Sequence, residues 1–402
     1  MTSGILNVNP YAMGENEEVY RSLQRRIDAL PVPFPETSGG AELRLLHHLF
    51  NLEEAAVACE LSAVSEPVSR IQKRMKKKGF RYTESEVKKL LNGLLAKGAI
   101  TGGVVKTKKG VERTYSLMPL AIGMFEMQVD RLTEDYTRDF EEYLDGGFSR
   151  AILGNRIGQV RTVPVSSAIE SSSSVGAYDQ IEKFVLESQG PFGVMNCVCR
   201  QGKDLLDESC DHSDIRETCL TIGPSAAAMS RRGNARLVER EEFLALLKRA
   251  EEKGFVLQAK NTREPGFICC CCGDCCEILT NAKKLPRPVE AFHTNFFARL
   301  ETDLCNGCTR CVQRCQMDAV KMNGPVRGDG GKPTPVIDLD RCIGCGLCVA
   351  TCPTGSLSLV STKRKTIPPR NASFMYGKMY IERRGVFGAL LLVAKYLLGR
   401  KV

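Results

Sequence analysis

Eight cysteines in the last quarter of the chain have a spacing suited to metal chemistry. They form two runs, DLCNGCTRCVQRC at 303–315 and DRCIGCGLCVATCPTG at 340–355, and each run contains the pattern C-x2-C-x2-C-x3-C. Thiolates at this spacing bind a 4Fe-4S cluster, an inorganic group that exchanges electrons. The two runs therefore predict a pair of iron-sulfur clusters and a function in electron transfer.

The fourth cysteine of each run is expected to bind the cluster of the other run. Three thiolates two residues apart surround one cluster from a tight loop, whereas the fourth lies on the following helix and points the other way. The predicted ligand sets are therefore crossed between the runs. One set is Cys305, Cys308, Cys311 and Cys352, and the other is Cys342, Cys345, Cys348 and Cys315.

A pair of zinc sites is the alternative interpretation, because C-x2-C repeats also hold tetrahedral zinc. Zinc needs only four ligands and gains nothing from a third cysteine at the same spacing in both runs. The repeated third cysteine therefore favours iron-sulfur clusters.

Residues 296–362 resemble the bacterial dicluster ferredoxins, most closely in VIDLDRCIGCGLCVATCPTGSLSL. The resemblance implies a ferredoxin-like fold that holds two clusters of low reduction potential. Two features depart from that family. Gln316 takes the place of the proline that usually follows the fourth cysteine, and the connection 316–341 is longer than usual. This connection could cover a cluster or contact a partner.

Ten further cysteines precede these runs and predict a third iron-sulfur site. They lie within eighty residues, in NCVCR, at two single positions and in FICCCCGDCC, whereas the first 196 residues contain only Cys59. Core packing does not require so many thiols. The preferred ligands are Cys197, Cys199, Cys269 and Cys271, with Cys210, Cys219, Cys272 and Cys275 as candidates for the same or a second site.

The preference within the dense block follows from the geometry of a strand. Neighbouring side chains point to opposite faces, so Cys269 and Cys271 share a face and the residue between them does not. The amphipathic helix predicted in RLVEREEFLALLKRAEEKGF would return the chain to the same end of the domain. Free buried thiols are the alternative for Cys210 and Cys219, and a surface position is the alternative for His212.

Residues 20–362 as a whole resemble a multidomain family of 4Fe-4S proteins from anaerobic bacteria. The similarity rests on a helical module, a CxCR segment, an ICxCCxxCC-like block and the dicluster region, and it implies iron-sulfur electron transfer in anaerobic metabolism. The triplet Cys271-Cys272-Gly273 also resembles the CCG motif of heterodisulfide reductase subunits, although the next cysteine pair follows sooner here. That similarity implies a cluster that itself performs chemistry.

The composition limits the classes of function. The 402 residues carry a net charge of +9 and contain no Trp and only four His. The sequence has no G-x-G-x-x-G after a strand, no P-loop and no His-Glu-x-x-His, so binding of flavin, NAD or ATP and hydrolysis are unsupported. The N-terminus lacks the pattern of a signal peptide, and thiols bound to metal in the cytoplasm are expected.

We expect an α+β protein of several domains. Pro and Ser in VRTVPVSSAIESSSSVG indicate a linker, and PLAIGMFEMQVDRLTEDYTRDFEEYL has the pattern of a long acidic helix. The predicted segments are an N-terminal arm (1–36), a winged-helix-like domain with the long helix (37–145), a linker (146–178), a Cys-rich iron-sulfur domain (179–290), a dicluster ferredoxin domain (291–365) and an amphipathic tail (366–402).

Residues 37–118 predict three helices followed by a hairpin. AELRLLHHLF, NLEEAAVACEL and TESEVKKLLNGLLAKGA have apolar residues at helical spacing, and ITGGVVKTKKGVERTYSLM alternates around a Lys-Lys-Gly turn. This order resembles winged helix-turn-helix domains, which implies a helix in the major groove and basic residues on phosphates. Docking onto another domain or subunit is the preferred alternative, because no base-reading residue can be identified.

The tail contains an apolar run at 385–398, which is shorter than the about 20 residues of a membrane span. The basic residues Arg383, Arg384, Arg400 and Lys401 flank this run. The segment 383–401 could therefore lie on the inner face of the membrane, fill a groove of a partner or complete the protein's own core.

The leading hypothesis is an electron-transfer protein or subunit that passes electrons through two 4Fe-4S clusters and a third Cys-ligated cluster to a partner oxidoreductase. No residue is assigned a catalytic role, and a subunit is favoured over a stand-alone enzyme. One alternative is a redox-sensing regulator whose winged helix binds DNA. The other is a reductase that binds its substrate at the third cluster.

Overall fold

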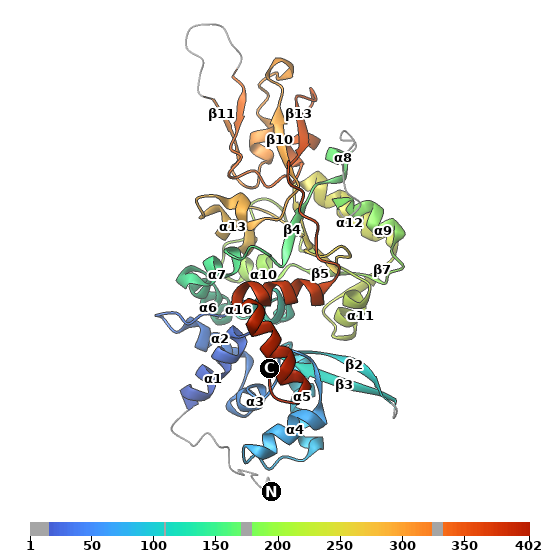
Figure 1. Cartoon of the computed structure of the whole chain (residues 1–402). Coiled ribbons are helices and arrows are strands. Elements are labelled where there is room, and N and C mark those ends of the chain that lie inside the picture. The colour runs from blue at the N-terminus through green and yellow to red at the C-terminus, as the bar shows by residue number, and fades with distance from the viewer. Residues whose placement is uncertain (1–15, 108–109, 170–178, 324–332) are drawn as a thin grey trace. The chain divides into compact units, whose positions relative to one another are not determined.

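The computed structural model describes residues 16–107, 110–169, 179–323 and 333–402 (Figure 1). The chain forms two compact units. Unit 1 consists of Met1–Ile152 and Tyr376–Val402, and unit 2 of Leu153–Met375. Helices and several antiparallel sheets occur together, which confirms the predicted α+β class.

Unit 1 is mainly helical. The Asn51 and Thr83 side chains cap the starts of α3 and α5 in capping boxes. The apolar face of α1 is fully buried, so this helix replaces much of the predicted N-terminal arm. The helices are α1 (Asn16–Asp28), α2 (Ala41–Leu49), α3 (Leu52–Ala58), α4 (Val68–Lys77), α5 (Glu84–Lys97) and α6 (Glu134–Tyr143).

A three-stranded antiparallel sheet accompanies these helices. The predicted hairpin is confirmed as β2 (Thr101–Thr107) paired with β3 (Gly110–Ser116). The short strand β1 (Glu66–Pro67) adds to the other edge of β3, so the strand order is β1-β3-β2. Helix α4 follows β1 directly, and neither of these two elements was predicted from the sequence.

The long acidic helix predicted over 119–144 is wrong in its first half. Regular helix begins only at Glu134, where the Thr133 hydroxyl accepts a hydrogen bond from the Tyr136 backbone N–H. Gly123 upstream has a non-helical backbone, with φ 174° and ψ −109°. The apolar periodicity continues across this break because Phe125 stacks on Phe140 of α6. The apolar spacing on the two sides of the break therefore has the same pattern as one continuous helix would have.

Unit 2 is built on a six-stranded antiparallel sheet with the order β4-β8-β9-β6-β5-β7. The strands are β4 (Val160–Val163), β5 (Phe192–Asn196), β6 (Glu217–Ile222), β7 (Arg236–Val238), β8 (Val256–Lys260) and β9 (Phe267–Cys271). The helices that accompany them are α8 (Ser166–Ile169), α9 (Ile181–Glu187), α10 (Val198–Leu205), α11 (Pro224–Arg231), α12 (Arg240–Lys253) and α13 (Glu277–Lys283).

A strand lies inside the segment that was predicted to be a linker. Within 146–178, β4 pairs with β8 at the edge of the sheet, and Arg161 of β4 forms a buried ion pair of 2.6 Å with Asp179. The strand was not predicted because it has only four residues and because the surrounding Pro and Ser residues are typical of a linker. The Ser-rich part at 170–178 lies outside the described residues.

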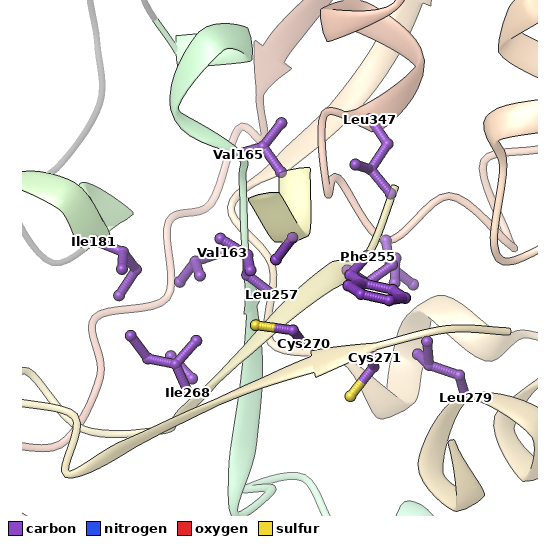
Figure 2. Close-up of a cluster of buried hydrophobic side chains, with 14 of the residues drawn as sticks. Val163, Val165, Ile181, Phe255, Leu257, Ile268, Cys270, Cys271, Leu279 and Leu347 are labelled. Atoms are coloured by element: carbon purple, nitrogen blue, oxygen red, sulfur yellow. The ribbon is translucent and has the colours of Figure 1, made fainter. Parts of the chain in front are cut away.

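The dicluster region packs against this sheet through one continuous apolar core. Figure 2 shows Val163, Leu257 and Ile268 of the sheet together with Leu347 of the dicluster region. The predicted domains 179–290 and 291–365 therefore share a compact unit. The elements of the dicluster region are β10 (Phe296–Leu300) paired with β13 (Leu357–Ser361), β11 (Val320–Met322) paired with β12 (Pro335–Ile337), and the short helices α14 (Arg310–Arg314) and α15 (Leu347–Ala350).

The C-terminal helix α16 (Ala372–Leu397) bends at Gly385, whose φ is +70°. Beyond the bend several apolar side chains face solvent, including Phe387 at 81% and Leu397 at 76% exposure. Among the described residues, no helix combines the length and the apolar character needed to cross a bilayer. Contact of 383–401 with a membrane surface stays a prediction.

Candidate metal centres

One cavity of unit 2 brings together the first predicted set of four thiols. Its empty volume is about 310 Å³, and its lining comes from the loop before α14, from α14 and from the turn after α15. The cysteines in the lining are Cys305, Cys308, Cys311 and Cys352. Three of them belong to the first run and the fourth to the second run.

A second cavity, of about 370 Å³, brings together the other set. Cys315 reaches it from the C-terminal end of α14, and apolar neighbours such as Ile343 and Leu347 complete the lining. The cysteines in this lining are Cys315, Cys342, Cys345 and Cys348. The fold thus places the fourth cysteine of each run with the first three of the other run.

The donor sets of the two cavities fit 4Fe-4S clusters. Each cavity offers four thiols, and the described residues of both linings include no histidine and no carboxylate that would compete. Cys352 illustrates how the fold prepares a thiolate. Burial opposes its ionisation, but hydrogen bonds from Ser356 at 3.2 Å and from Thr354 outweigh burial and lower the pKa of the thiol to about 7.

The two cavities differ in their exposure. Cys308 of the first set is exposed, whereas no cysteine of the second set is; the most buried members of the two sets, Cys311, Cys342 and Cys348, are each 8% exposed. Burial raises the pKa of the Cys345 thiol to about 12, and the backbone carbonyl of Cys345 accepts a hydrogen bond of 3.0 Å from Val165. The first cavity therefore lies toward solvent and the second toward the Cys-rich sheet.

Six other cysteines converge at one end of that sheet, and we call them the six-thiol group. Cys219 on β6 lies opposite Cys269 on β9, and Cys271 follows on the same face of β9. Cys197 and Cys276 immediately precede α10 and α13. Each thiol of the group forms a hydrogen bond with the next one in the series Cys197, Cys199, Cys276, Cys271, Cys269 and Cys219.

Hydrogen bonds between the thiols of this group favour the ionised forms of some members. A hydrogen bond from Cys199 lowers the pKa of Cys197 to about 7, against the effect of burial. Hydrogen bonds from Cys199 and Cys271, and the backbone N–H groups at the start of α13, lower the pKa of Cys276. Thiolates of this kind are metal ligands and nucleophiles.

A separate cluster of side chains, the Cys210 group, consists of Cys210, Cys272, Asp274 and Cys275. The sulfur atoms of Cys210 and Cys272 are 3.7 Å apart, and Oδ2 of Asp274 lies 3.2 Å from the Cys210 sulfur. His212 contributes only its backbone N–H, which donates to Asp274 over 3.1 Å. Its ring contacts the Lys253 carbonyl oxygen instead.

The structure therefore divides the predicted third site into two groups. The preferred ligands Cys197, Cys199, Cys269 and Cys271 all lie in the six-thiol group, together with the candidate Cys219. The candidates Cys210, Cys272 and Cys275 lie in the Cys210 group.

Three residues of the dense block complete this division. Cys276 was missed as a member of the six-thiol group, although its place directly before the helix α13 was a usable signal. Asp274 was also missed, because a carboxylate between cysteine pairs has no distinctive spacing. Cys270 is 2% exposed in the apolar core, and Figure 2 shows its side chain leaving β9 in a different direction from that of Cys271.

A buried guanidinium lies between the two thiol groups. Arg200 of α10 is 1% exposed, and its Nη2 donates to the Cys272 sulfur over 3.0 Å. It also interacts with the Cys210 thiol, and it contacts three neutral groups: the Thr218 hydroxyl, the Cys270 carbonyl oxygen and the ring of Phe255 at 4.4 Å. A buried cation requires a nearby anion, so thiolate sulfur is its counter-charge.

Gln316 joins the dicluster region to the dense cysteine block. Its side-chain oxygen accepts a hydrogen bond of 2.7 Å from the Gly273 backbone N–H, and its amide lies 3.4 Å from a ring nitrogen of His212. A Cβ atom at Gly273 would lie only 2.2 Å from the Gln316 carbonyl oxygen, so only glycine permits this approach. A proline at position 316 could not make the side-chain contact.

Replacing Gln316 with alanine should lower the free energy of unfolding by about 1 to 3 kcal/mol, because the Gly273 N–H loses its acceptor in a partly buried position. Thermal unfolding of the anaerobic, metal-loaded chain measures this change. Gln313→Ala is the matched control, since Gln313 is exposed on α14, three residues before Gln316. Equal stability of the two variants would show that the junction contributes nothing.

Comparison with known proteins supports the dicluster region alone. The model of the 4Fe-4S dicluster domain family matches residues 304–356, a range that includes both cysteine runs. No curated protein and no solved structure matches the chain. The predicted 4Fe-4S dicluster domain is therefore confirmed, whereas the winged helix and the anaerobic origin stay predictions.

Proposed function

We propose that this chain is an iron-sulfur electron-transfer protein, or such a subunit of an oxidoreductase. The observation that carries the proposal is the pair of four-thiol cavities inside a matched 4Fe-4S dicluster domain. When bound, a 4Fe-4S cluster gains and loses single electrons. The side chains of the protein have the tasks of holding the clusters, tuning them and giving a partner access.

The differing exposure of the two cavities supports a direction for this transfer. Exposed Cys308 marks the side that a soluble partner can approach, whereas the lining of the second cavity includes the buried apolar side chains of Ile343 and Leu347. The junction between Gln316 and Gly273 places the inner site next to the Cys-rich sheet. We infer that electrons pass between a partner on the Cys308 side and the six-thiol group.

A third iron-sulfur cluster in the six-thiol group is part of the proposal. Its thiols come from three strands or strand ends and two helix starts, which is a costly arrangement for a core that needs only packing. The buried charge of Arg200 next to the thiols supports an anionic centre there.

The test is metal analysis and reductive titration of the full chain, purified without oxygen. About eight irons would correspond to the dicluster pair alone and about twelve to one additional cubane. Dithionite should produce paramagnetic signals of reduced clusters, and reoxidation should abolish them. Material without iron and without a reducible centre would refute the proposed function.

A redox-sensing DNA-binding regulator is the second candidate, and the topology of unit 1 favours it. Helix α3, strand β1, helices α4 and α5 and the hairpin β2-β3 follow one another in the winged-helix order, with β3 between β1 and β2. Lys88 and Lys89 are exposed on α5, the helix that would enter the major groove.

Gel retardation of a mixed-sequence DNA duplex by the anaerobic chain tests this second candidate. A regulator should bind at low salt and weaken steeply as salt rises, because phosphate contacts release counterions. The double variant Lys88→Glu, Lys89→Glu should weaken binding about tenfold or more, whereas Lys248→Glu on exposed α12 should not. No retardation at low salt would remove this candidate.

A further inference from the structure

We propose that the Cys210 group binds a single divalent metal ion of the zinc class, separate from every iron-sulfur cluster. Three thiols and one carboxylate, from Cys210, Cys272, Cys275 and Asp274, would form a tetrahedral site. This inference goes beyond the proposed electron-transfer function and does not depend on it.

The distances within the group match one metal ion. Two thiolates that each lie about 2.3 Å from a tetrahedral zinc ion are about 3.8 Å apart. The Cys210 and Cys272 sulfur atoms are 3.7 Å apart. A carboxylate oxygen about 2.1 Å from the same ion would lie about 3.6 Å from each sulfur, and Asp274 Oδ2 is 3.2 Å from the Cys210 sulfur. With all four ligand atoms within 4.8 Å of one another, the group has the compact spacing of a site for one ion.

The dicluster cavities provide an internal comparison. In a cubane each cysteine binds a different iron, so the sulfur atoms lie much further apart than at a mononuclear site. In the Cys210 group all four ligand atoms lie within 4.8 Å of one another. Among the described residues, neither four-cysteine set of the dicluster cavities meets this distance limit. The same fold thus contains two classes of thiol spacing.

Strand geometry and Arg200 separate this group from the six-thiol group. Cys271 ends β9 on the face shared with Cys269, whereas Cys272 follows the strand and has its sulfur beside that of Cys210. Arg200 donates to the Cys272 sulfur at 3.0 Å and also contacts the Cys270 carbonyl oxygen from the same guanidinium. A cation in that position compensates the negative charge of three thiolates and a carboxylate around one divalent ion.

Hydrogen bonds outside the ligands hold them in place. The His212 backbone N–H donates to Asp274 Oδ2, and the His212 ring contacts both Lys253 and Gln316. A bound ion would therefore fasten the Cys210 loop to the turn that contains Gly273, beside the dicluster junction. Cys272 and Cys275 are buried, whereas Asp274 is exposed and is the ligand that solvent can reach.

Metal analysis of the anaerobic full chain, expressed with zinc and iron in the medium, tests the proposal. We expect about one zinc per chain in addition to iron. Cys210→Ser and Asp274→Asn should each weaken zinc binding at least about tenfold and leave the iron content unchanged. Cys59→Ser is the matched control, because Cys59 is a buried thiol of unit 1, whereas both thiol groups belong to unit 2.

Cobalt provides a second measurement that does not depend on the folding of a variant. After removal of zinc with a chelator, Co²⁺ added to the wild-type chain should saturate at one equivalent. Its spectrum should show thiolate-to-cobalt charge transfer and the strong visible bands of tetrahedral Co²⁺.

Three results would overturn the proposal. The first is a wild-type chain that binds neither zinc nor cobalt. The second is loss of iron in Cys210→Ser in proportion to any loss of zinc, which would make Cys210 a cluster ligand. The third is a single high-spin iron in place of zinc. A chain that binds zinc but no iron would instead refute the proposed electron-transfer function and leave this site intact.

Discussion

Replacing Cys315 with alanine should remove about four irons from the chain, and they should come from the cavity that contains Cys342, Cys345 and Cys348. Cys315 belongs to the other run in sequence but lines this inner cavity. Its sulfur accepts a hydrogen bond of 3.2 Å from the Ala319 backbone N–H, so the fold already orients it toward the site. Alanine supplies no ligand, and a cubane held by only three thiols is less stable than one held by four.

Two double variants test the crossed arrangement directly. Cys315→Ala with Cys345→Ala affects one cavity, so it should lose no more iron than Cys315→Ala alone. Cys315→Ala with Cys311→Ala stays within one run but affects both cavities, so it should lose about eight irons. Iron and sulfide analysis, with Cys59→Ala as the control, measures both. If the second pair behaved like a single variant, ligation would follow the runs and the crossing would be wrong.

Paramagnetic resonance gives an independent check on the same variants. Two reduced clusters in neighbouring cavities that share α14 and α15 should interact magnetically and broaden each other's signals. Cys315→Ala should replace this pattern with the simpler signal of one cluster. A broadened spectrum that survives in Cys315→Ala would contradict the assignment of that cavity.

The predictability of these sites depends on how local their ligands are. Cys305, Cys308 and Cys311 lie within seven consecutive residues, so their spacing alone limits what they can bind. The choice between Cys275 and Cys276 is not local. Because of the turn around Gly273 and the start of α13, Cys275 lies in the Cys210 group and Cys276 lies in the six-thiol group. The pattern of residues in CCCCGDCC does not predict where that turn directs each side chain.

The fold shows the same dependence on tertiary contacts. Helices α3 and α5 begin at local signals, the capping boxes of Asn51 and Thr83, and both helices were predicted from the sequence. Strand β4 was taken for linker because its stability comes from pairing with β8, about a hundred residues away in sequence. Gln316 was recognised as a departure from the ferredoxin pattern. Its structural role, a hydrogen bond with the Gly273 backbone N–H, could not be predicted because Gly273 is distant in sequence.

Replacing Arg200 with methionine should have the largest effect on stability of any substitution outside the cysteines. Arg200 is 1% exposed and is paired with sulfur rather than with a carboxylate among its described contacts. Removing one partner of a buried charge pair costs about 3 to 5 kcal/mol, because the other charge remains buried without compensation. In a unit of this size we expect the unfolding temperature to fall by roughly 6 to 20 °C.

The same substitution should also reduce metal binding, and this separates a charge effect from a loss of packing. Methionine fills much of the volume of arginine but leaves the charges of Cys272 and the neighbouring thiolates uncompensated. Iron and zinc per chain should therefore fall in Arg200→Met, whereas Arg200→Lys keeps the charge and should retain more of both. Arg231→Met, at an exposed position of α11, is the control. If Arg200→Met kept its full metal content and stability, the thiols beside Arg200 would be neutral, and neither group would hold an anionic metal centre.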